Sequence, residues 1–367
     1  ELSLFFFTMG NLGIFGNTVR KMAKNPLSGH IFVNALFARM FTGIIIFALP
    51  LIFYPKLGVA FFAASLFFDY VTSVCDAALQ ANYLMGRATL ALLLGRAVNL
   101  TIVLGLISYN VPNQADIFFL APIVATAATA AASLYFVRRR FAFRFKFDFP
   151  LMKEILLSSV PFGLINIVNN IYYRFLPSYL VAKILTNAQF ASYNVGLHIS
   201  SYAALLSTFL MFSVLPEFKA SLKNNPERAK ELFKLSKKTL ALMALAMLVF
   251  GTLLAPTAIK LLTGKEYFIP ELSFVLPMML VLAAISYFYD LLLISLFALE
   301  KERWFLKREI AALAIASSIF LAATQTTDPI LGVFLILLGA ISGELSMVVM
   351  AGKKLNSIFR LSFSRVR

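Results

Sequence analysis

The strongest constraint on this chain is a series of long apolar runs separated by short charged loops. An apolar helix of about 20 residues is long enough to cross the roughly 30 Å hydrocarbon core of a bilayer. Such runs cover residues 31–54, 58–80, 88–109, 115–137, 153–182, 190–215, 239–262, 272–298, 305–324 and 329–351, with a shorter one at 2–16. They lack the period-two alternation of membrane β-barrels. The sequence therefore predicts an all-α polytopic membrane protein.

The composition supports this class. Hydrophobic residues make up 60% of the chain and charged residues 14%, and the mean hydropathy of +0.84 lies outside the range of ordinary water-soluble domains. The single cysteine, Cys75, excludes an internal disulfide and argues against a zinc site built on cysteines. We therefore expect no metal centre.

The formal net charge of +16 is explained by the loops. When alternate loops are assigned to opposite sides, nearly all lysines and arginines fall on one side, around residues 20–24, 87, 138–153, 219–238, 301–308 and 353–367. The other side carries only Lys56, Lys183, Lys260 and Lys265. Basic loops mark the cytoplasmic side. We expect a multi-pass protein of the cytoplasmic (inner) membrane with a cytoplasmic C-terminus, and no nucleic-acid partner.

A basic and phenylalanine-rich segment, RRRFAFRFKFDFP at residues 138–150, divides the chain. It is typical of an amphipathic linker at the membrane surface. The predicted parts are an N-terminal lobe at 1–137, the linker at 138–150 and a C-terminal six-helix lobe at 151–367. Because the chain begins with Glu1 and a short first run, we expect the first helix to be missing, giving two six-helix bundles. Lys-Asn-Pro and Asn-Asn-Pro turns 200 residues apart support a parallel repeat.

Ionisable residues within the predicted spans are the main functional signal. Each costs roughly 2.5 to 3.5 kcal/mol at mid-membrane, so it normally faces a partner or a watery cavity. The residues are Arg39, Asp69, Asp76, Arg96, Arg174, Asp290 and Glu344. They either pair with one another to hold the bundle together, or line a hydrated cavity in which arginines attract an anionic substrate and acids bind coupling ions.

Helical spacing places several of these residues on polar faces. Ser65, Asp69, Ser73, Asp76 and Gln80 form one stripe, and a second surrounds Arg174, bracketed by Pro161 and Pro177. The prolines can hinge or unwind that helix. The substrate-binding candidates are Arg39, Arg96, Arg174, Asn166, Asn170 and Tyr173. The ion-coupling candidates are Asp69, Asp76, Asp290 and Glu344, with H⁺ or Na⁺ as the coupling ion and no other cofactor.

Motifs of membrane and nucleotide-driven enzymes are absent from the sequence. It contains no Walker loop, HExxH, GxSxG or cysteine and histidine cluster. Acids in the predicted outer loops are scattered, at Asp116, Glu266, Glu271 and Asp328. We therefore predict a protein that is not an enzyme and has no catalytic residues.

The pattern resembles the polysaccharide transporter, or O-antigen flippase, branch of the multidrug/oligosaccharidyl-lipid/polysaccharide (MOP) exporter superfamily. The resemblance covers nearly the whole chain. It is carried by four segments: GNLGIFGNTVRKMAKNP, SSVPFGLINIVNNIYYRFLPSYL, NAQFASYNVGLHISSYAALLSTFLMFSVLPEFKA and LFALEKERWFLKREIAALAIASSIFLA. It implies two six-helix lobes of the MATE-like type around a cleft that opens alternately to either side.

The resemblance also implies a cargo, a polyprenyl-diphosphate-linked oligosaccharide held in a cationic cavity for cell-surface polysaccharide biosynthesis. Membrane lipids and other proteins of glycan polymerisation and export are the expected partners. Three alternatives stay open: an ion-coupled multidrug or small-molecule exporter of the same fold, an integral-membrane glycosyl or acyl transferase, and an assembly subunit of a glycan-synthesis complex.

Overall fold

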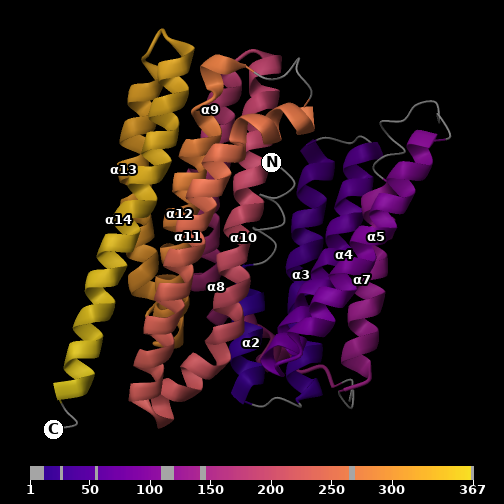
Figure 1. Ribbon diagram of the computed structural model, residues 1–367. Helices are drawn as coiled ribbons and strands as arrows, with labels where there is room; N and C mark the ends of the chain where they lie inside the picture. Colours follow the sequence, from indigo (N-terminus) through magenta and orange to yellow (C-terminus); the bar gives the residue numbers. More distant parts are fainter. Residues whose placement is uncertain are drawn as a thin grey trace. The chain divides into compact units, whose positions relative to one another are not determined.

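The computed structural model describes residues 12–24, 28–53, 57–108, 120–140, 146–263 and 269–364, which are helical almost throughout (Figure 1). The chain divides into two compact units, one ending at Ile167 and the other beginning at Val168. The helices of the first unit are α2 (Ile14–Lys24), α3 (Gly29–Phe53), α4 (Leu57–Ala81), α5 (Met85–Ser108) and α7 (Leu120–Arg138). Helix α8 (Phe149–Asn170) starts in the first unit and ends in the second.

The second unit continues with a π-helix, η1 (Ile171–Phe175), and the short helix α9 (Leu176–Ile184). It then contains α10 (Asn187–Asn224), α11 (Pro226–Thr263), the 3₁₀ turn η3 (Pro270–Leu272), α12 (Val275–Ala298), α13 (Glu302–Thr324) and α14 (Pro329–Ser364). The long apolar stretches form helices because a helix satisfies every backbone hydrogen bond internally, which a bilayer core demands.

The helices agree with the predicted spans. Within the described ranges, seven helical stretches are long and apolar enough to cross a membrane, beginning at Met85, Leu120, Phe149, Asn187, Pro226, Pro270 and Pro329. Helix α13 is not one of these seven, because five of its first eight residues are charged and lower its mean hydropathy. The all-α polytopic class is therefore confirmed. The predicted run at 2–16 and the centre of the linker at 138–150 lie mostly outside the described residues.

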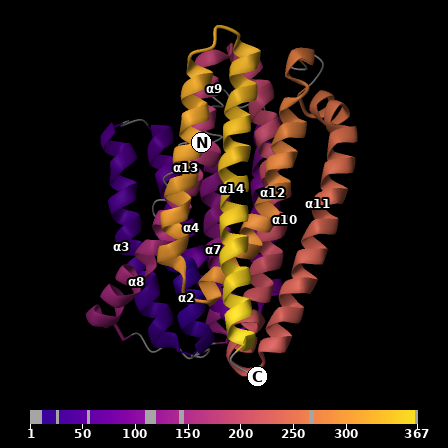
Figure 2. The same ribbon diagram turned by 90° about the vertical axis from the view of Figure 1, so that its left-hand side faces the viewer.

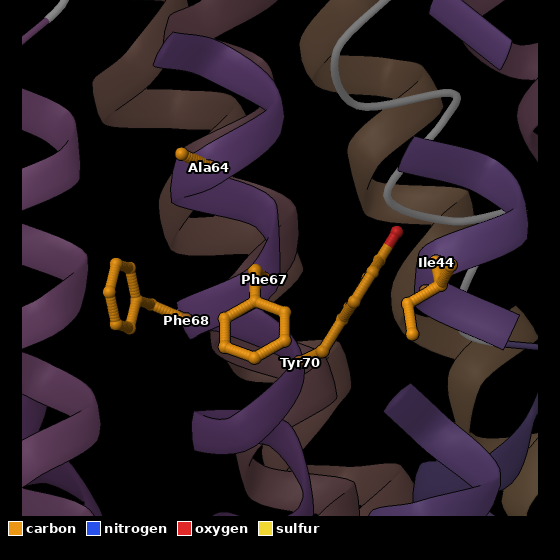
Figure 3. Close-up of a pocket in the computed structure, with 6 residues that line it drawn as sticks. Ile44, Ala64, Phe67, Phe68 and Tyr70 are labelled. Carbon is orange, nitrogen blue, oxygen red and sulfur yellow. The ribbon is translucent and has the colours of Figure 1, made fainter. Parts of the chain in front are cut away.

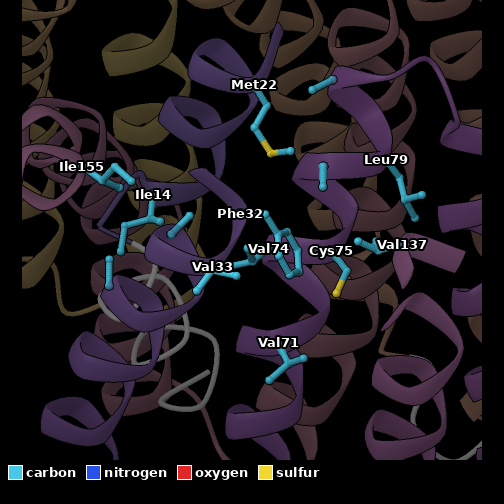
Figure 4. Close-up of a cluster of buried hydrophobic side chains, with 14 of the residues drawn as sticks. Ile14, Met22, Phe32, Val33, Val71, Val74, Cys75, Leu79, Val137 and Ile155 are labelled. Carbon is cyan, nitrogen blue, oxygen red and sulfur yellow. The ribbon is translucent and has the colours of Figure 1, made fainter. Parts of the chain in front are cut away.

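The first unit is built around α4, which packs against α2, α3 and α7, while α5 packs against α7. Its core includes Phe32, Val74, Cys75 and Leu79 (Figure 4). Cys75 is therefore an apolar core residue. The N-terminal part of α8 is tied to this unit by Asn17, whose amide nitrogen donates to the Ile155 carbonyl and to the Ser158 and Ser159 hydroxyls at 2.8 to 3.1 Å.

The second unit is built around α12, which packs against α10, α11 and α14, while α13 packs against α14 (Figure 2). Helix α12 is apolar on nearly all sides, and most of its residues are buried. A helix of this kind belongs in the centre of a bundle. Helix α10 begins with a capping box in which Thr186 and Gln189 bond to each other's backbone.

The two units repeat the same internal packing order. Contacts of α4 with α2, α3 and α7 correspond to those of α12 with α10, α11 and α14. Both central helices also end in the same turn. After α4, the Leu84 N–H donates to the Leu79 carbonyl, and after α12 the Lys301 N–H donates to the Leu296 carbonyl. The residue before each donor, Tyr83 or Glu300, has a left-handed backbone conformation. This repetition supports the predicted parallel repeat.

Helix α8 continues through η1 into α9 without ending at either proline. Pro161 lies inside α8, and Pro177 lies at the start of α9. Because Pro177 has no N–H to donate, the turn before it widens, and the Leu176 N–H donates to the Ile171 carbonyl five residues earlier. The units separate within α8, after Ile167, whereas the sequence starts the second lobe at 151; that division stays a prediction.

Candidate functional site

A buried arginine is the centre of the first unit's polar cluster. Arg39 of α3 is completely buried, and its guanidinium carbon lies 4.2 Å from the centre of the Tyr70 ring. Asp69 of α4 interacts electrostatically with both Arg39 and Arg96, the latter from α5. The structure therefore brings together two of the three predicted arginines and one predicted acid. A cation over an aromatic face contributes about 2 kcal/mol when it is desolvated.

Tyr70 reaches this position because α3 has a glycine beside it. A Cβ atom added to Gly43 would lie 2.4 Å from Cδ2 of Tyr70, so the ring lies directly on the α3 backbone. The same residues border an apolar pocket of about 390 Å³ between α3 and α4, lined also by Ile44, Ala64 and Phe67 (Figure 3). The Tyr70 ring therefore contacts the Arg39 guanidinium and also lines the apolar pocket.

The second predicted acid of α4, Asp76, lies two stripe positions beyond Asp69, after Ser73. It faces Ser133 of α7 and is repelled by Asp69, seven residues away on the same face. The stripe predicted from spacing is therefore present, with Ser65 and Gln80 buried on it. In the first unit, Asp69 of the stripe is therefore close to two arginines, whereas Asp76 faces a serine and the other acid.

The second unit contains an acidic cluster of different character. Glu309 of α13 and Glu344 of α14 are fully buried and repel each other electrostatically. Oε1 of Glu309 accepts hydrogen bonds from the Tyr289 hydroxyl of α12 at 3.2 Å and the Asn169 amide of α8 at 3.3 Å. The same amide donates to the Tyr172 hydroxyl of η1 at 3.1 Å.

Asp290 of α12 has hydroxyl partners. Oδ2 of Asp290 accepts hydrogen bonds from the Ser207 and Thr208 hydroxyls of α10, at 2.6 and 2.7 Å. These bonds join two helices through a side chain that would otherwise be unsatisfied in an apolar interior. Asp290 therefore links α12 to α10, and its predicted role in ion coupling stays a prediction.

The remaining predicted residues follow one another along α8 and η1. Asn166 and Asn170 are partly buried, Asn166 in the first unit and Asn170 in the second, and Tyr173 is buried in the second. The backbone of Arg174 belongs to η1, but its side chain lies outside the described residues. The roles predicted for these four residues in substrate binding stay predictions.

Glu309, Tyr172 and Tyr289 were not among the residues predicted from the sequence. Glu309 follows Lys307 and Arg308 directly, so it looks like part of a charged helix flank. A signal was nevertheless present, because Phe305, Ala312 and Ala316 lie one or two turns away on the same face of α13, and all three are buried. A carboxylate in the middle of an apolar helical stripe indicates an interior position.

The part of the chain that the structure describes has no group of three or more His, Cys, Asp or Glu side chains arranged to hold a metal ion. Its polar clusters are instead of two kinds, one with arginines around an acid and one with paired carboxyls and tyrosines.

The fold is that of MATE transporters. An outward-facing multidrug resistance MATE family transporter of the MOP superfamily is similar with a TM-score of 0.77 and 17% identity, over 98% of this chain and 85% of that chain. An inward-facing transporter of the same description has a TM-score of 0.72 and 16% identity, over 98% of this chain and 88% of that chain. The MATE transporter ClbM in complex with Rb⁺ has a TM-score of 0.71 and 15% identity, over 96% of this chain and 84% of that chain.

No curated protein is significantly similar to the chain in sequence. A protein-family model described as "Polysaccharide biosynthesis protein" matches residues 11–269, which is more than half of the chain. The match and the fold together indicate a transporter rather than an enzyme. The chain belongs to this polysaccharide biosynthesis protein family and has the fold of MATE transporters of the MOP superfamily.

Proposed function

We propose that the protein exports a polyprenyl-diphosphate-linked oligosaccharide across the cytoplasmic membrane for cell-surface polysaccharide synthesis. The observation that carries this proposal is the combination of a polysaccharide biosynthesis family with a transporter fold. A protein that makes glycosidic bonds would need a catalytic site, whereas one that moves a finished glycan needs a cavity whose access alternates between the two sides. Its C-terminus is cytoplasmic, because the basic loops and the tail lie on one side.

The cargo is recognised by its diphosphate. Arginine suits this task because its planar guanidinium donates two parallel hydrogen bonds to phosphate oxygens and keeps its charge at all physiological pH values. Arg39 and Arg96 supply two positive charges beside the carboxylate of Asp69. Arg174, in η1 of the second unit, is a further candidate predicted from the sequence.

The test is a flipping assay in proteoliposomes that contain a fluorescent polyprenyl-diphosphate oligosaccharide. We expect the wild-type protein to move the lipid and Arg39→Lys to move it more slowly, because lysine keeps the charge and loses the paired donors. Arg303→Lys, at an exposed position of α13, is the matched control. Absence of flipping by the folded wild-type protein, with cargo matched to its source, would refute the proposal.

A second candidate function is export of small cationic or apolar drugs. It is favoured by one observation, the similarity of the fold to multidrug resistance transporters. The same proteoliposomes distinguish the two functions. A drug exporter would expel a fluorescent lipophilic cation and leave the lipid-linked glycan in place, and its transport would not require Arg39.

A further inference from the structure

The charge of the α13–α14 helix pair is concentrated at one end. The two helices pack side by side (Figure 2). The turn that joins them carries the acid Asp328 and no lysine or arginine. The opposite end carries two acids, Glu300 and Glu302, and six basic residues: Lys301, Arg303, Lys307, Arg308, Lys353 and Lys354. This end therefore attracts anions.

The basic end lies at the surface of the bilayer. Helix α14 begins at Pro329, and its first basic residue is Lys353. At 1.5 Å per residue, Lys353 is about 36 Å along the helix, just beyond the roughly 30 Å hydrocarbon core. The phosphates of phospholipids lie at this level. The basic side chains and the lipid headgroups are therefore at the same depth.

Trp304, the single tryptophan of the chain, lies among these charges. The Arg308 guanidinium carbon of α13 is 5.7 Å from the centre of the Trp304 ring, and Nζ of Lys354 of α14 is 5.9 Å from it. Tryptophan is enriched at membrane interfaces, because its ring is apolar and its N–H is a hydrogen-bond donor. One cation from each helix thus meets at an interfacial tryptophan.

The protein does not neutralise these two cations. Glu300 pairs with Lys219 of α10 at 3.8 Å. In the part of the chain that the structure describes, neither Arg308 nor Lys354 is within ion-pair distance of a carboxylate. A contact with an aromatic face leaves N–H donors of a cation available. Arg308 and Lys354 therefore offer donors to an anion beside Trp304.

Helical spacing defines which residues of α13 belong to this place. Lys301 and Arg308 lie three residues before and four residues after Trp304, so all three share a face. Ile315 continues this face toward the apolar part of the helix and is 41% exposed. Arg303, next to Trp304 in sequence, points about 100° away around the helix. The face thus joins cations at the membrane surface to exposed apolar surface below them.

We infer that Lys301, Trp304, Arg308 and Lys354 form a binding site for an anionic phospholipid. It belongs to the leaflet that this end of the second unit faces, which is the cytoplasmic leaflet in the proposed orientation. The lipid phosphate accepts hydrogen bonds from Arg308 and Lys354, and an acyl chain lies along the face that ends at Ile315. Basic sites between helices on the cytoplasmic side are suited to anionic headgroups. The inference does not depend on which cargo is exported.

The experiment measures quenching of Trp304 fluorescence in the full chain, reconstituted in phosphatidylcholine vesicles. Brominated phosphatidylglycerol or brominated phosphatidylcholine is added, and bromine quenches only an indole that lies close to it. We expect the phosphatidylglycerol to occupy the site about five-fold more readily, because one basic residue near the surface favours an anionic lipid by about this factor. Equal quenching by the two lipids at equal mole fraction would overturn the inference.

Variants distinguish a site from diffuse surface charge. Arg308→Gln and Lys354→Gln should each lower the preference for phosphatidylglycerol toward that for phosphatidylcholine. Arg303→Gln, which removes an exposed charge from another face of α13, should keep it. Equal losses in Arg303→Gln and Arg308→Gln would contradict the site. The wild-type comparison needs no variant, so it tests the inference even if a variant fails to fold.

A lipid-linked diphosphate carries the same chemical group, and competition distinguishes the two sources of phosphate. With brominated phosphatidylglycerol bound, unlabelled phosphatidylglycerol should restore Trp304 fluorescence at least as well as an equal mole fraction of polyprenyl diphosphate. Better recovery with polyprenyl diphosphate would overturn the assignment to a phospholipid, because Trp304 would then lie in the path of the cargo.

Discussion

The two units of this protein combine the same packing plan with different polar clusters. In the first unit, the acid Asp69 on central helix α4 lies near Arg39 and Arg96. In the second, acids on α13 and α14 face one another and two tyrosines. A repeated scaffold therefore carries arginines around an acid in one unit and facing carboxyls without an arginine among the described side chains in the other.

Removal of the buried arginine should have the largest effect. Arg39→Ala leaves the partly buried carboxylate of Asp69 with one of its two cations and removes the group stacked on Tyr70. We expect a loss of about 3 to 5 kcal/mol, the usual effect of breaking a buried charge pair. The measurement is the thermal unfolding midpoint in detergent. Arg39→Lys should regain part of the stability that Arg39→Ala loses. Equal stability of the two variants would show that the charge is unimportant to the fold.

Helix packing in the two units can be compared through their glycines. A Cβ on Gly95 of α5 would lie 1.8 Å from the Thr129 hydroxyl and 2.8 Å from the Ala125 carbonyl of α7. A Cβ on Gly343 of α14 would lie no nearer than 3.1 Å to any atom. We therefore expect Gly95→Ala to lower stability by about 1 to 3 kcal/mol, the usual cost of overpacking.

Gly343→Ala should be clearly milder than Gly95→Ala in the same unfolding measurement. If Gly343→Ala lowered stability more than Gly95→Ala, the close approach of α5 and α7 would not limit the first unit's stability. Gly339 and Gly343, four residues apart on α14, both lie against α13, Gly339 beside Phe320 and Gly343 beside Ala316.

Asp290 offers a smaller test within the second unit. Asp290→Asn keeps the shape of the side chain but weakens the bonds from Ser207 and Thr208. Bonds to a charged group are each worth about 1.5 to 3 kcal/mol, so we expect a loss of about 1 to 2 kcal/mol. Ser207→Ala should give a comparable loss, and the double variant should be less than additive. Strict additivity would contradict the shared contact.

The smallest effect should come from the two equivalent turns. Tyr83 and Glu300 have φ angles of 59° and 56°, which are unfavourable for residues with a Cβ. We expect Tyr83→Gly to raise stability by about 1 kcal/mol. Glu300→Gly should raise it slightly less, because it also removes an exposed ion pair with Lys219 at 3.8 Å. A loss of stability in both variants would refute the correspondence of the turns.

The helices could be predicted from the sequence because their cause is local. A run of about 20 apolar residues is sufficient to define a spanning helix, and charged loops define its side. The stripe of Asp69 and Asp76 followed from helical spacing alone. The prolines at 161 and 177 correctly marked an irregular helix, although the π-turn itself depends on how the backbone adjusts before Pro177.

The partners of the interior charges could not be predicted, because they come from distant parts of the chain. Arg39 on α3 contacts Tyr70 on α4, and Asp290 on α12 accepts a hydrogen bond from Ser207 on α10, 83 residues earlier in the chain. Glu309 was overlooked because it directly follows Lys307 and Arg308, so less than one helical turn separates it from the charged start of α13. The predicted span at 272–298 ends where α12 ends, but the left-handed turn that follows could not be predicted, since Glu300 occupies a position where glycine is the usual signal.

The most direct test of the division between the units is binding of a polyprenyl diphosphate to two variants in nanodiscs. We predict that Arg39→Lys binds the lipid diphosphate more weakly than the wild-type protein, whereas Glu344→Gln binds it with unchanged or greater affinity at alkaline pH, because it carries one negative charge less. Weaker binding by Glu344→Gln than by Arg39→Lys would contradict the account, since the acidic cluster would then belong to the cargo site.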